Sequence, residues 1–154
     1  MKELGWTNVV QHTIQLLDER PVSKDNHPLD QKDQIWIKQE LKDLLKRGII
    51  RESTSTYLVP IVVVNKKMSD RHMYIDYRDL NAKTKKNSYP ISRQIEIFTS
   101  FQEAQWFTSL DLASGYWQVG MNENDKEKTA FIIPWWLFEW NVMPFGLYNA
   151  PAIF

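Results

Sequence analysis

A continuous apolar run, from Leu58 to Asn65, most strongly limits the folds open to this chain. The run is rich in β-branched residues, which favour extended backbone, and it is continuous enough to be buried on both faces of a sheet. Pro60 is tolerated only near the start of such a strand or at a sheet edge. Residues His72–Arg78 then alternate between apolar and polar side chains, which is the period of a half-buried strand. The two segments predict a hairpin whose tip, Lys66–Arg71, is rich in charge.

Helical signals lie on both sides of this hairpin. From Asp30 to Arg47 the apolar residues recur at helical spacing, with Asp30 suited to cap the start and Gly48 to end the helix. A shorter helix is expected over Ser92–Ser100. Residues 1–28 carry two prolines and only weak signals, so we expect them to form an irregular arm.

The last third of the chain combines further strands with tight turns. We expect a strand over Trp106–Leu112, and a hairpin of Thr129–Ile133 with Leu137–Met143 around Pro134. The sequence Asn149-Ala150-Pro151 is typical of a helix start. Because so short a helix is not stable alone, we expect the chain to be a piece of a longer protein. Together these elements predict an α+β fold.

The charges cancel over the whole chain but not along it. Nineteen basic residues balance nineteen acidic ones, so no global basic charge indicates a nucleic-acid partner. Residues 1–100 nevertheless carry a net charge of +4 and residues 101–154 one of −4, and the segment Asn65–Arg93 alone carries +5. Such a cluster is most often a solvated face, and phosphate binding is the alternative.

Two absences narrow the function further. The chain has no cysteine, which excludes disulfides, thiol nucleophiles and cysteine-ligated zinc. Its longest apolar stretch, Ala130–Phe138, is interrupted by a proline and is far shorter than a membrane span. Since residues 1–30 show no secretory signal either, we expect an intracellular protein with no membrane partner.

Asp111 is the residue that the expected strands do not explain. An acid in an otherwise apolar strand costs several kcal/mol unless it is paired, neutral or bound to metal. One interpretation is a carboxylate that caps the following turn. The other is a metal ligand at the end of the strand, where the N–H groups of Ser114 and Gly115 could bind an anion. From the residues alone both interpretations stay open.

The segment Leu110–Gln118, which reads LDLASGYWQ, closely resembles the first catalytic motif of reverse transcriptases of gypsy-type long-terminal-repeat retrotransposons. Four other segments are similar to motifs of this family and follow in the family's order: Ile75–Asn81, Tyr89–Ile91, Lys128–Phe131 and Met143–Pro151. The resemblance implies the right-hand fold of these polymerases. Residues 1–28 would be an N-terminal arm, 29–90 the fingers region, and 91–154 a partial palm with an incomplete antiparallel sheet.

The resemblance also implies roles for matching residues. Asp111 would be the catalytic residue and would bind two Mg²⁺ ions, assisted by the backbone carbonyl of Leu112. Tyr116 would be the steric gate that excludes a ribose 2′-hydroxyl. Asp76 and Arg78 would hold the template side. The remaining residues implied to bind the incoming nucleotide are Lys66, Lys67, His72, Ser114, Gly115, Phe145 and Gly146.

The implied function is that of an RNA-directed DNA polymerase. It would add deoxynucleotides from deoxynucleoside triphosphates to a primer on an RNA or DNA template. Its further partner would be the remainder of a Pol polyprotein, in the cytoplasm or in virus-like particles of the parent element. The tyrosine-x-aspartate-aspartate motif that completes the family's metal site is absent from residues 1–154, so we expect the chain alone to be inactive.

Several residues depart from the family's pattern. Asn65 stands where a lysine is usual, and His72 where an arginine usually grips the triphosphate. Trp135 and Trp136 occupy a turn that usually holds a small or polar residue and a glycine. We also expect apolar surface around these two residues, Phe138 and Trp140 to be open to water. Two alternatives to the enzyme remain, a non-catalytic remnant and a nucleic-acid-binding fragment that uses residues 65–93.

Overall fold

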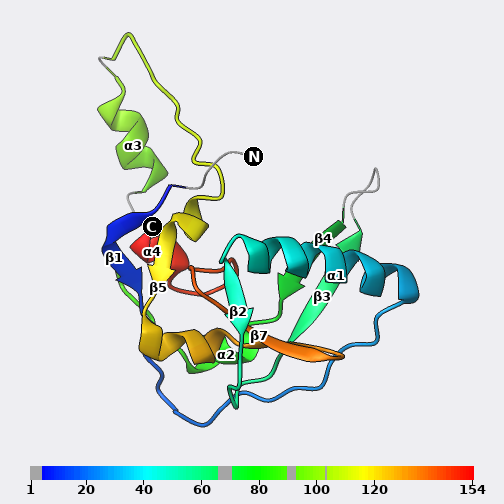
Figure 1. Cartoon of the computed structure of the whole chain (residues 1–154). Coiled ribbons are helices and arrows are strands. Elements are labelled where there is room, and N and C mark those ends of the chain that lie inside the picture. The colour runs from blue at the N-terminus through cyan, green and yellow to red at the C-terminus, as the bar shows by residue number, and fades with distance from the viewer. Residues whose placement is uncertain (1–4, 66–70, 90–92, 103) are drawn as a thin grey trace.

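A computed structural model describes residues 5–65, 71–89, 93–102 and 104–154 (Figure 1). Its elements follow the order β1 (Thr7–His12), α1 (Gln31–Lys46), β2 (Ile50–Glu52), β3 (Val59–Asn65), β4 (Arg71–Ile75), α2 (Arg78–Lys83), α3 (Gln94–Ser100), the 3₁₀ helix η1 (Gly115–Gln118), β5 (Val119–Met121), the 3₁₀ helix η2 (Glu123–Thr129), β6 (Phe131–Ile133), β7 (Trp136–Trp140) and α4 (Ala150–Ile153). The expected α+β class is confirmed.

A five-stranded sheet in the order β2-β7-β6-β3-β4 forms the centre of the fold. Strands β3 and β4 pair antiparallel, from Ile61 opposite Ile75 to Asn65 opposite Arg71, which confirms the predicted hairpin. On its other side β3 runs parallel to β6, so the sheet is mixed. The prediction that β3 is buried on both faces is wrong. Ile61 is buried, but Val62 and Val64 are exposed, because helix α1 covers only one face of the strand.

Helix α1 forms as its sequence predicts. The side chain of Asp30 accepts a hydrogen bond from the Asp33 N–H at 2.7 Å and caps the start. Gly48 follows the helix with a φ of +68°, a left-handed conformation that glycine adopts without strain. The apolar stripe of the helix packs on the sheet, and the main residues of this core are Ile37, Leu41, Leu44, Ile61, Phe131 and Phe138. Each fully buried side chain of this size contributes about 1.5–3 kcal/mol.

The hairpin of β6 and β7 also forms where expected, with Ile133 opposite Trp136. The expected exposure of its aromatic residues is correct only in part. Trp135 and Trp136 are exposed, whereas Phe138 and Trp140 are buried. The reason is that β2 pairs with β7 and α1 covers the same face, so the inward side chains of β7 lie in the core.

The N-terminal residues differ from the expected irregular arm. Residues 7–12 form strand β1, which pairs in parallel with β5. Two hydrogen bonds to the backbone of Ile14 extend this contact. The Asp125 carboxylate accepts from the Ile14 N–H at 3.0 Å, and Lys128 Nζ donates to the Ile14 carbonyl at 2.9 Å. Asp125 and Lys128 are themselves paired at 2.6 Å. Local sequence carries no signal for a partner more than a hundred residues away.

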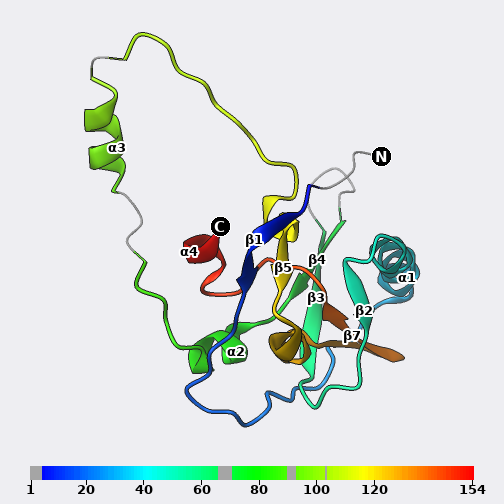
Figure 2. The ribbon, with the colours of Figure 1, turned by 60° about the vertical axis from the view of Figure 1, so that its left-hand side comes forward.

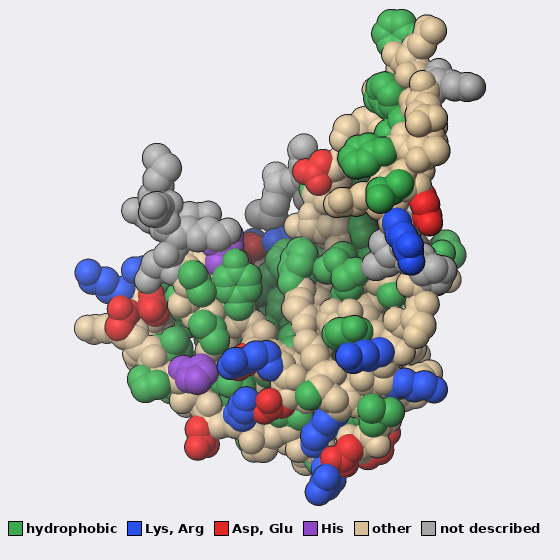
Figure 3. All heavy atoms as spheres, turned by 180° about the vertical axis from the view of Figure 1, so that it is seen from behind, with side chains coloured by type: hydrophobic (Ala, Val, Ile, Leu, Met, Phe, Trp, Pro, Cys, Tyr) green, Lys and Arg blue, Asp and Glu red, His purple; other side chains and the backbone are tan. Residues whose placement is uncertain are grey.

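Helix α3 and residues 104–113, which we call the excursion, lie away from the body of the fold (Figures 1 and 2). The expected strand over Trp106–Leu112 is wrong, because these residues are irregular and exposed. Trp106 is 92% exposed and Leu110 85% exposed. No strand within the described residues pairs with this segment, and an unpaired strand is not stable. Hydrophobic side chains consequently gather along the excursion in Figure 3.

Helix α4 begins with Ala150 and Pro151, as its sequence predicts, but the Asn149 side chain makes no capping hydrogen bond. Among the described helices, none combines the length and the hydropathy that crossing a bilayer would require.

The buried His12 predicts how the stability of the fold depends on pH. His12 is 1% exposed, and burial lowers its pKa from 6.5 to about 4, an effect that the nearby Asp125 carboxylate partly offsets. The unfolded chain therefore takes up a proton at a pH where the folded chain does not. We expect stability to be full above pH 6.5 and to fall by about 2–3 kcal/mol as the pH drops from 6.5 to 4.

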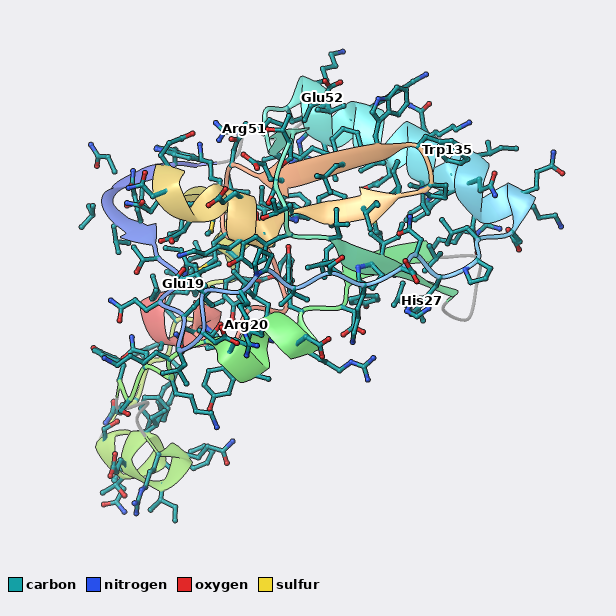
Figure 4. All side chains as sticks on the ribbon, turned by 90° about the horizontal axis from the view of Figure 1, so that it is seen from below. Glu19, Arg20, His27, Arg51, Glu52 and Trp135 are labelled. Carbon is teal, nitrogen blue, oxygen red and sulfur yellow. The ribbon has the colours of Figure 1, made fainter. Side chains whose placement is uncertain are left out.

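Urea titrations monitored by circular dichroism at several pH values will measure this loss. His12→Gln is expected to flatten the profile over this range. The matched control is His27→Gln, because His27 is exposed and lies in the stretch before α1 (Figure 4). An equally steep fall in the His12→Gln variant would show that another group is responsible.

Candidate functional site

A cavity of about 720 Å³ lies between α1, β4 and η1. Four of the residues predicted to bind a nucleotide line it together, namely His72, Ser114, Phe145 and Gly146. They come from strand β4, from the residue before η1 and from the turn after β7. The structure therefore brings together, in one cavity, residues from three segments that span more than seventy positions of the sequence.

The rest of the lining is mainly apolar. Three indoles, those of Trp36, Trp117 and Trp140, line the cavity. The Trp117 ring lies 6.0 Å from that of Trp140 and 6.2 Å from that of Phe145, and the Arg47 guanidinium lies 5.4 Å from the centre of the Trp117 ring. Such a wall suits a ligand with a flat or apolar part.

The ring of Tyr116 lies beside this cavity in a fixed aromatic setting. Its centroid is 5.1 Å from that of Phe145 and 5.2 Å from that of Phe154, which meets it edge-on. Phe154 also lies against Gly115, where a Cβ atom would come within 2.5 Å of the Phe154 ring. A side chain at position 115 would therefore push on the ring that supports Tyr116.

Two backbone conformations at the cavity are unusual. Ser114 has a φ of +51° and a ψ of +46°, a left-handed conformation that is uncommon for any residue but glycine. Residues held in this way are concentrated at functional sites. Gly146 has a φ of +93°, and a Cβ at this position would contact the Tyr77 ring at 3.5 Å. The cavity is thus bordered by two turns that the surrounding structure holds in place.

Asp76 and Arg78 form a pair at the start of α2 and do not line the cavity. Arg78 donates to the Asp76 carboxylate from Nε and Nη2, both at 2.7 Å. These hydrogen bonds lower the pKa of Asp76 to about 2. The Arg78 side chain is 82% exposed, so one edge of its guanidinium faces solvent.

The predicted catalytic residue is not brought to the cavity. Asp111 and Leu112 lie on the exposed excursion, three and two residues before Ser114. A carboxylate and a carbonyl oxygen are the hard ligands that Mg²⁺ prefers, so their donor chemistry fits this ion. Within the described residues, however, no three acidic or histidine side chains gather as a metal site would require. Lys66 and Lys67 fall outside the described residues.

Two further cavities are more polar than the one lined by His72 and Ser114. One of about 480 Å³ is lined by Arg51, Glu123 and Glu139. Arg51, labelled in Figure 4, is paired with Glu139 at 2.7 Å and with Glu123 at 2.6 Å. Glu127 adds a third carboxylate, so acidic groups outnumber Arg51 and the cavity does not favour a phosphate. A smaller one of about 290 Å³ is lined by Lys85, Lys86 and other polar residues.

Sequence reasoning missed the contribution of α1 to the cavity. Trp36 and Glu40 lie one helical turn apart and both line it. Their spacing is the only local signal, because they sit beside the buried stripe of Ile37, Leu41 and Leu44 rather than in it. Only the packing of α1 against the sheet shows that they face β4.

The sequence pattern of the family described as "Reverse transcriptase (RNA-dependent DNA polymerase)" matches residues 64–154. The chain is 39% identical to the retrovirus-related Pol polyproteins of transposons 297 and gypsy from Drosophila melanogaster, over 99% and 98% of its length. It spans 15% of the length of each of these two polyproteins.

Solved structures give the same result for the fold. The native protease–reverse transcriptase of prototype foamy virus superposes with a TM-score of 0.86 at 27% identity, covering 99% of this chain and 20% of that one. A foamy viral protease–reverse transcriptase in complex with double-stranded DNA superposes with a TM-score of 0.78 at 26% identity, covering 99% and 26% respectively.

Proposed function

Because this chain belongs to the reverse transcriptase (RNA-dependent DNA polymerase) family, we propose that its cavity binds the incoming deoxynucleoside triphosphate of an RNA-directed DNA polymerase. The observation that carries the proposal is the convergence of His72, Ser114, Phe145 and Gly146 on one cavity. Residues 29–90 would then act as fingers and 91–154 as part of the palm, after an N-terminal arm over 1–28. The fold itself is that of reverse transcriptase fingers and palm.

The aromatic wall would receive the nucleoside. A flat base and an apolar sugar face suit the indoles that line the cavity. Tyr116 would act as the gate against a ribose 2′-hydroxyl. Support for this role comes from its ring contacts with Phe145 and Phe154, which leave the ring little room to give way. A gate must be rigid to exclude one oxygen atom.

The polar residues would hold the triphosphate. The N–H groups of Ser114 and Gly115 lie in a turn with left-handed backbone, the kind of turn that presents N–H groups to an anion. His72 would contribute a single imidazole where an arginine would offer a two-pronged donor, which predicts a weaker grip. Lys66 and Lys67 would add positive charge from the hairpin tip.

Catalysis would need groups beyond this cavity. Asp111 and the carbonyl of Leu112 would supply oxygen ligands to Mg²⁺, which in such sites polarises the reacting phosphoryl group and activates the attacking hydroxyl. Asp76 would hold Arg78 so that its exposed guanidinium contacts the phosphates of the template. The primer, an RNA or DNA template and the remainder of a Pol polyprotein would complete the enzyme, in the cytoplasm or in virus-like particles.

A chimeric polymerase tests the role of Asp111. Residues 1–154 replace the matching segment of the Drosophila gypsy Pol polyprotein, and the chimera is expected to extend a primer. Asp111→Asn should lower its kcat by roughly a thousandfold or more, because several kcal/mol of transition-state stabilisation are lost. Template affinity should change by less than about twofold, since the phosphate contacts remain.

The matched control for this experiment is Glu127→Gln, an exposed carboxylate on η2. It is expected to leave primer extension unchanged. Near-parental extension by the Asp111→Asn chimera would contradict the catalytic role of this residue.

Binding of a deoxyribonucleotide and of the matching ribonucleotide tests whether Tyr116 acts as the gate. Titration of the chain with Mg²⁺–dCTP and Mg²⁺–CTP, followed by tryptophan fluorescence, compares two ligands that differ in one hydroxyl. Tyr116→Val is expected to strengthen CTP binding by about tenfold and to change dCTP binding by less than about threefold, because the variant relieves a clash with that hydroxyl alone. Tyr89→Val, at an exposed tyrosine, is the control. Equal weakening of both nucleotides would mean that Tyr116 only fills space.

A further inference from the structure

Two asparagine side chains join α2 and the residues after it to the turn that borders the cavity. The Asn81 Nδ2 donates to the Gly146 carbonyl at 2.8 Å, and its Oδ1 accepts from the Tyr148 N–H at 2.8 Å. Asn149 makes the reverse connection. Its Nδ2 donates to the Lys85 carbonyl at 2.9 Å, and its Oδ1 accepts from the Asn87 N–H at 2.9 Å. Each side-chain amide thus donates one hydrogen bond to a backbone segment and accepts one from it, as a neighbouring β-strand would.

The local secondary structure explains neither asparagine. Asn81 lies within the short helix α2, where asparagine is a poor helix former. Asn149 precedes α4 at the position where an asparagine side chain usually caps the helix, yet it makes no capping bond and is buried. Both side chains instead form hydrogen bonds with backbone groups that are more than sixty residues away in the sequence.

The turn that they hold has little support of its own. Residues 143–149 belong to no helix or strand, and Gly146 adopts a positive φ. Backbone hydrogen bonds hold only its two ends. The Met143 N–H donates to the Val119 carbonyl at 2.8 Å, and the N–H of Ala150, the first residue of α4, donates to the Leu147 carbonyl at 3.2 Å. The position of Phe145 and Gly146 at the cavity therefore depends on contacts with other segments, among which the Asn81 hydrogen bonds reach Gly146 directly.

We propose that Asn81 and Asn149 are positioning residues for the turn of residues 143–149. Asn81 joins this turn to α2, and Asn149 joins it to the backbone of Lys85 and Asn87, which follows α2. This rests on the proposed nucleotide site for its functional meaning. The consequence is a link between two parts of the enzyme. Arg78 and Asn81 lie three residues apart on one helix, so the contact with the template and the wall of the nucleotide cavity are carried by the same rigid turn of helix.

Amide hydrogen exchange of the ¹⁵N-labelled chain tests the two connections separately. In Asn81→Ala the Tyr148 amide is expected to exchange at least about tenfold faster, because its acceptor is lost, while the Asn87 amide changes by less than about twofold. In Asn149→Ala the Asn87 amide should exchange at least about tenfold faster, while the Tyr148 amide changes by less than about twofold. Asn124→Ala, at an exposed asparagine of η2, is the control and should alter neither.

A second variant separates the two halves of the Asn81 connection. Asn81→Asp keeps an acceptor for the Tyr148 N–H but loses the donor to the Gly146 carbonyl. It is expected to keep the Tyr148 amide protected and still to weaken Mg²⁺–dCTP binding. In Asn81→Ala the dissociation constant for Mg²⁺–dCTP, measured by tryptophan fluorescence, should rise about tenfold, whereas Asn124→Ala should leave it unchanged.

Each result decides one part of the inference. An unchanged Tyr148 exchange rate in Asn81→Ala overturns the proposal, whether or not the chain binds nucleotide. Faster exchange with unchanged Mg²⁺–dCTP affinity overturns the positioning role and leaves a purely structural contact. Faster exchange in a chain that binds no nucleotide even in its native form supports the connection between the turn and α2, and it overturns the nucleotide site alone.

Discussion

The buried hydroxyl of Tyr77 holds together the segments on which the candidate site depends. It donates to the Thr129 carbonyl at 2.8 Å in the interior, and the Thr129 hydroxyl in turn accepts from the Trp140 N–H at 3.0 Å. Burial raises the pKa of Tyr77 well above its usual value, so the hydroxyl stays a neutral donor. Loss of this donor would leave a buried carbonyl unpaired, which costs about 1–3 kcal/mol.

The position of Tyr77 explains why one hydrogen bond matters for function. Asp76 and Arg78 are its neighbours in the chain, and its ring lies against Gly146, where any side chain would meet it. The turn at the cavity, the ion pair at the start of α2 and the end of η2 are therefore all arranged around one aromatic residue. The apolar wall of the cavity, including Leu44 and Trp140, belongs to the core under α1, and Tyr77 supports the side formed by Gly146.

Some elements could be predicted from the sequence because interactions between residues close together in the chain determine them. The capped stripe of α1 and the β-branched run of β3 are patterns that one element carries alone, and both elements form, although β3 is buried on one face only. The expected strand over Trp106–Leu112 failed for the opposite reason. Its sequence pattern is that of a strand, but a strand needs a partner, and none within the described part of the chain lies beside it.

In the candidate site, too, some residues could be predicted from sequence motifs, whereas others depend on contacts between distant segments. His72, Ser114, Phe145 and Gly146 were named from motif resemblance, and the structure adds that they share a cavity. The wall formed by Trp36 and the two-point contacts of Asn81 could not be predicted, because they depend on how distant segments pack. Asp111 lies outside that packed part, so its role stays a prediction that rests on its place in the motif.

The most direct measurement of the central claim is an amide chemical-shift titration of the ¹⁵N-labelled chain with Mg²⁺–dCTP. If the cavity is the nucleotide site, the shifts will be largest at His72, Ser114, Phe145 and Gly146 and will saturate together. The basic residues Lys85 and Lys86 line a different cavity and serve as the internal comparison. Shifts confined to Lys85 and Lys86, or no saturable shift at the four cavity residues, would contradict the account.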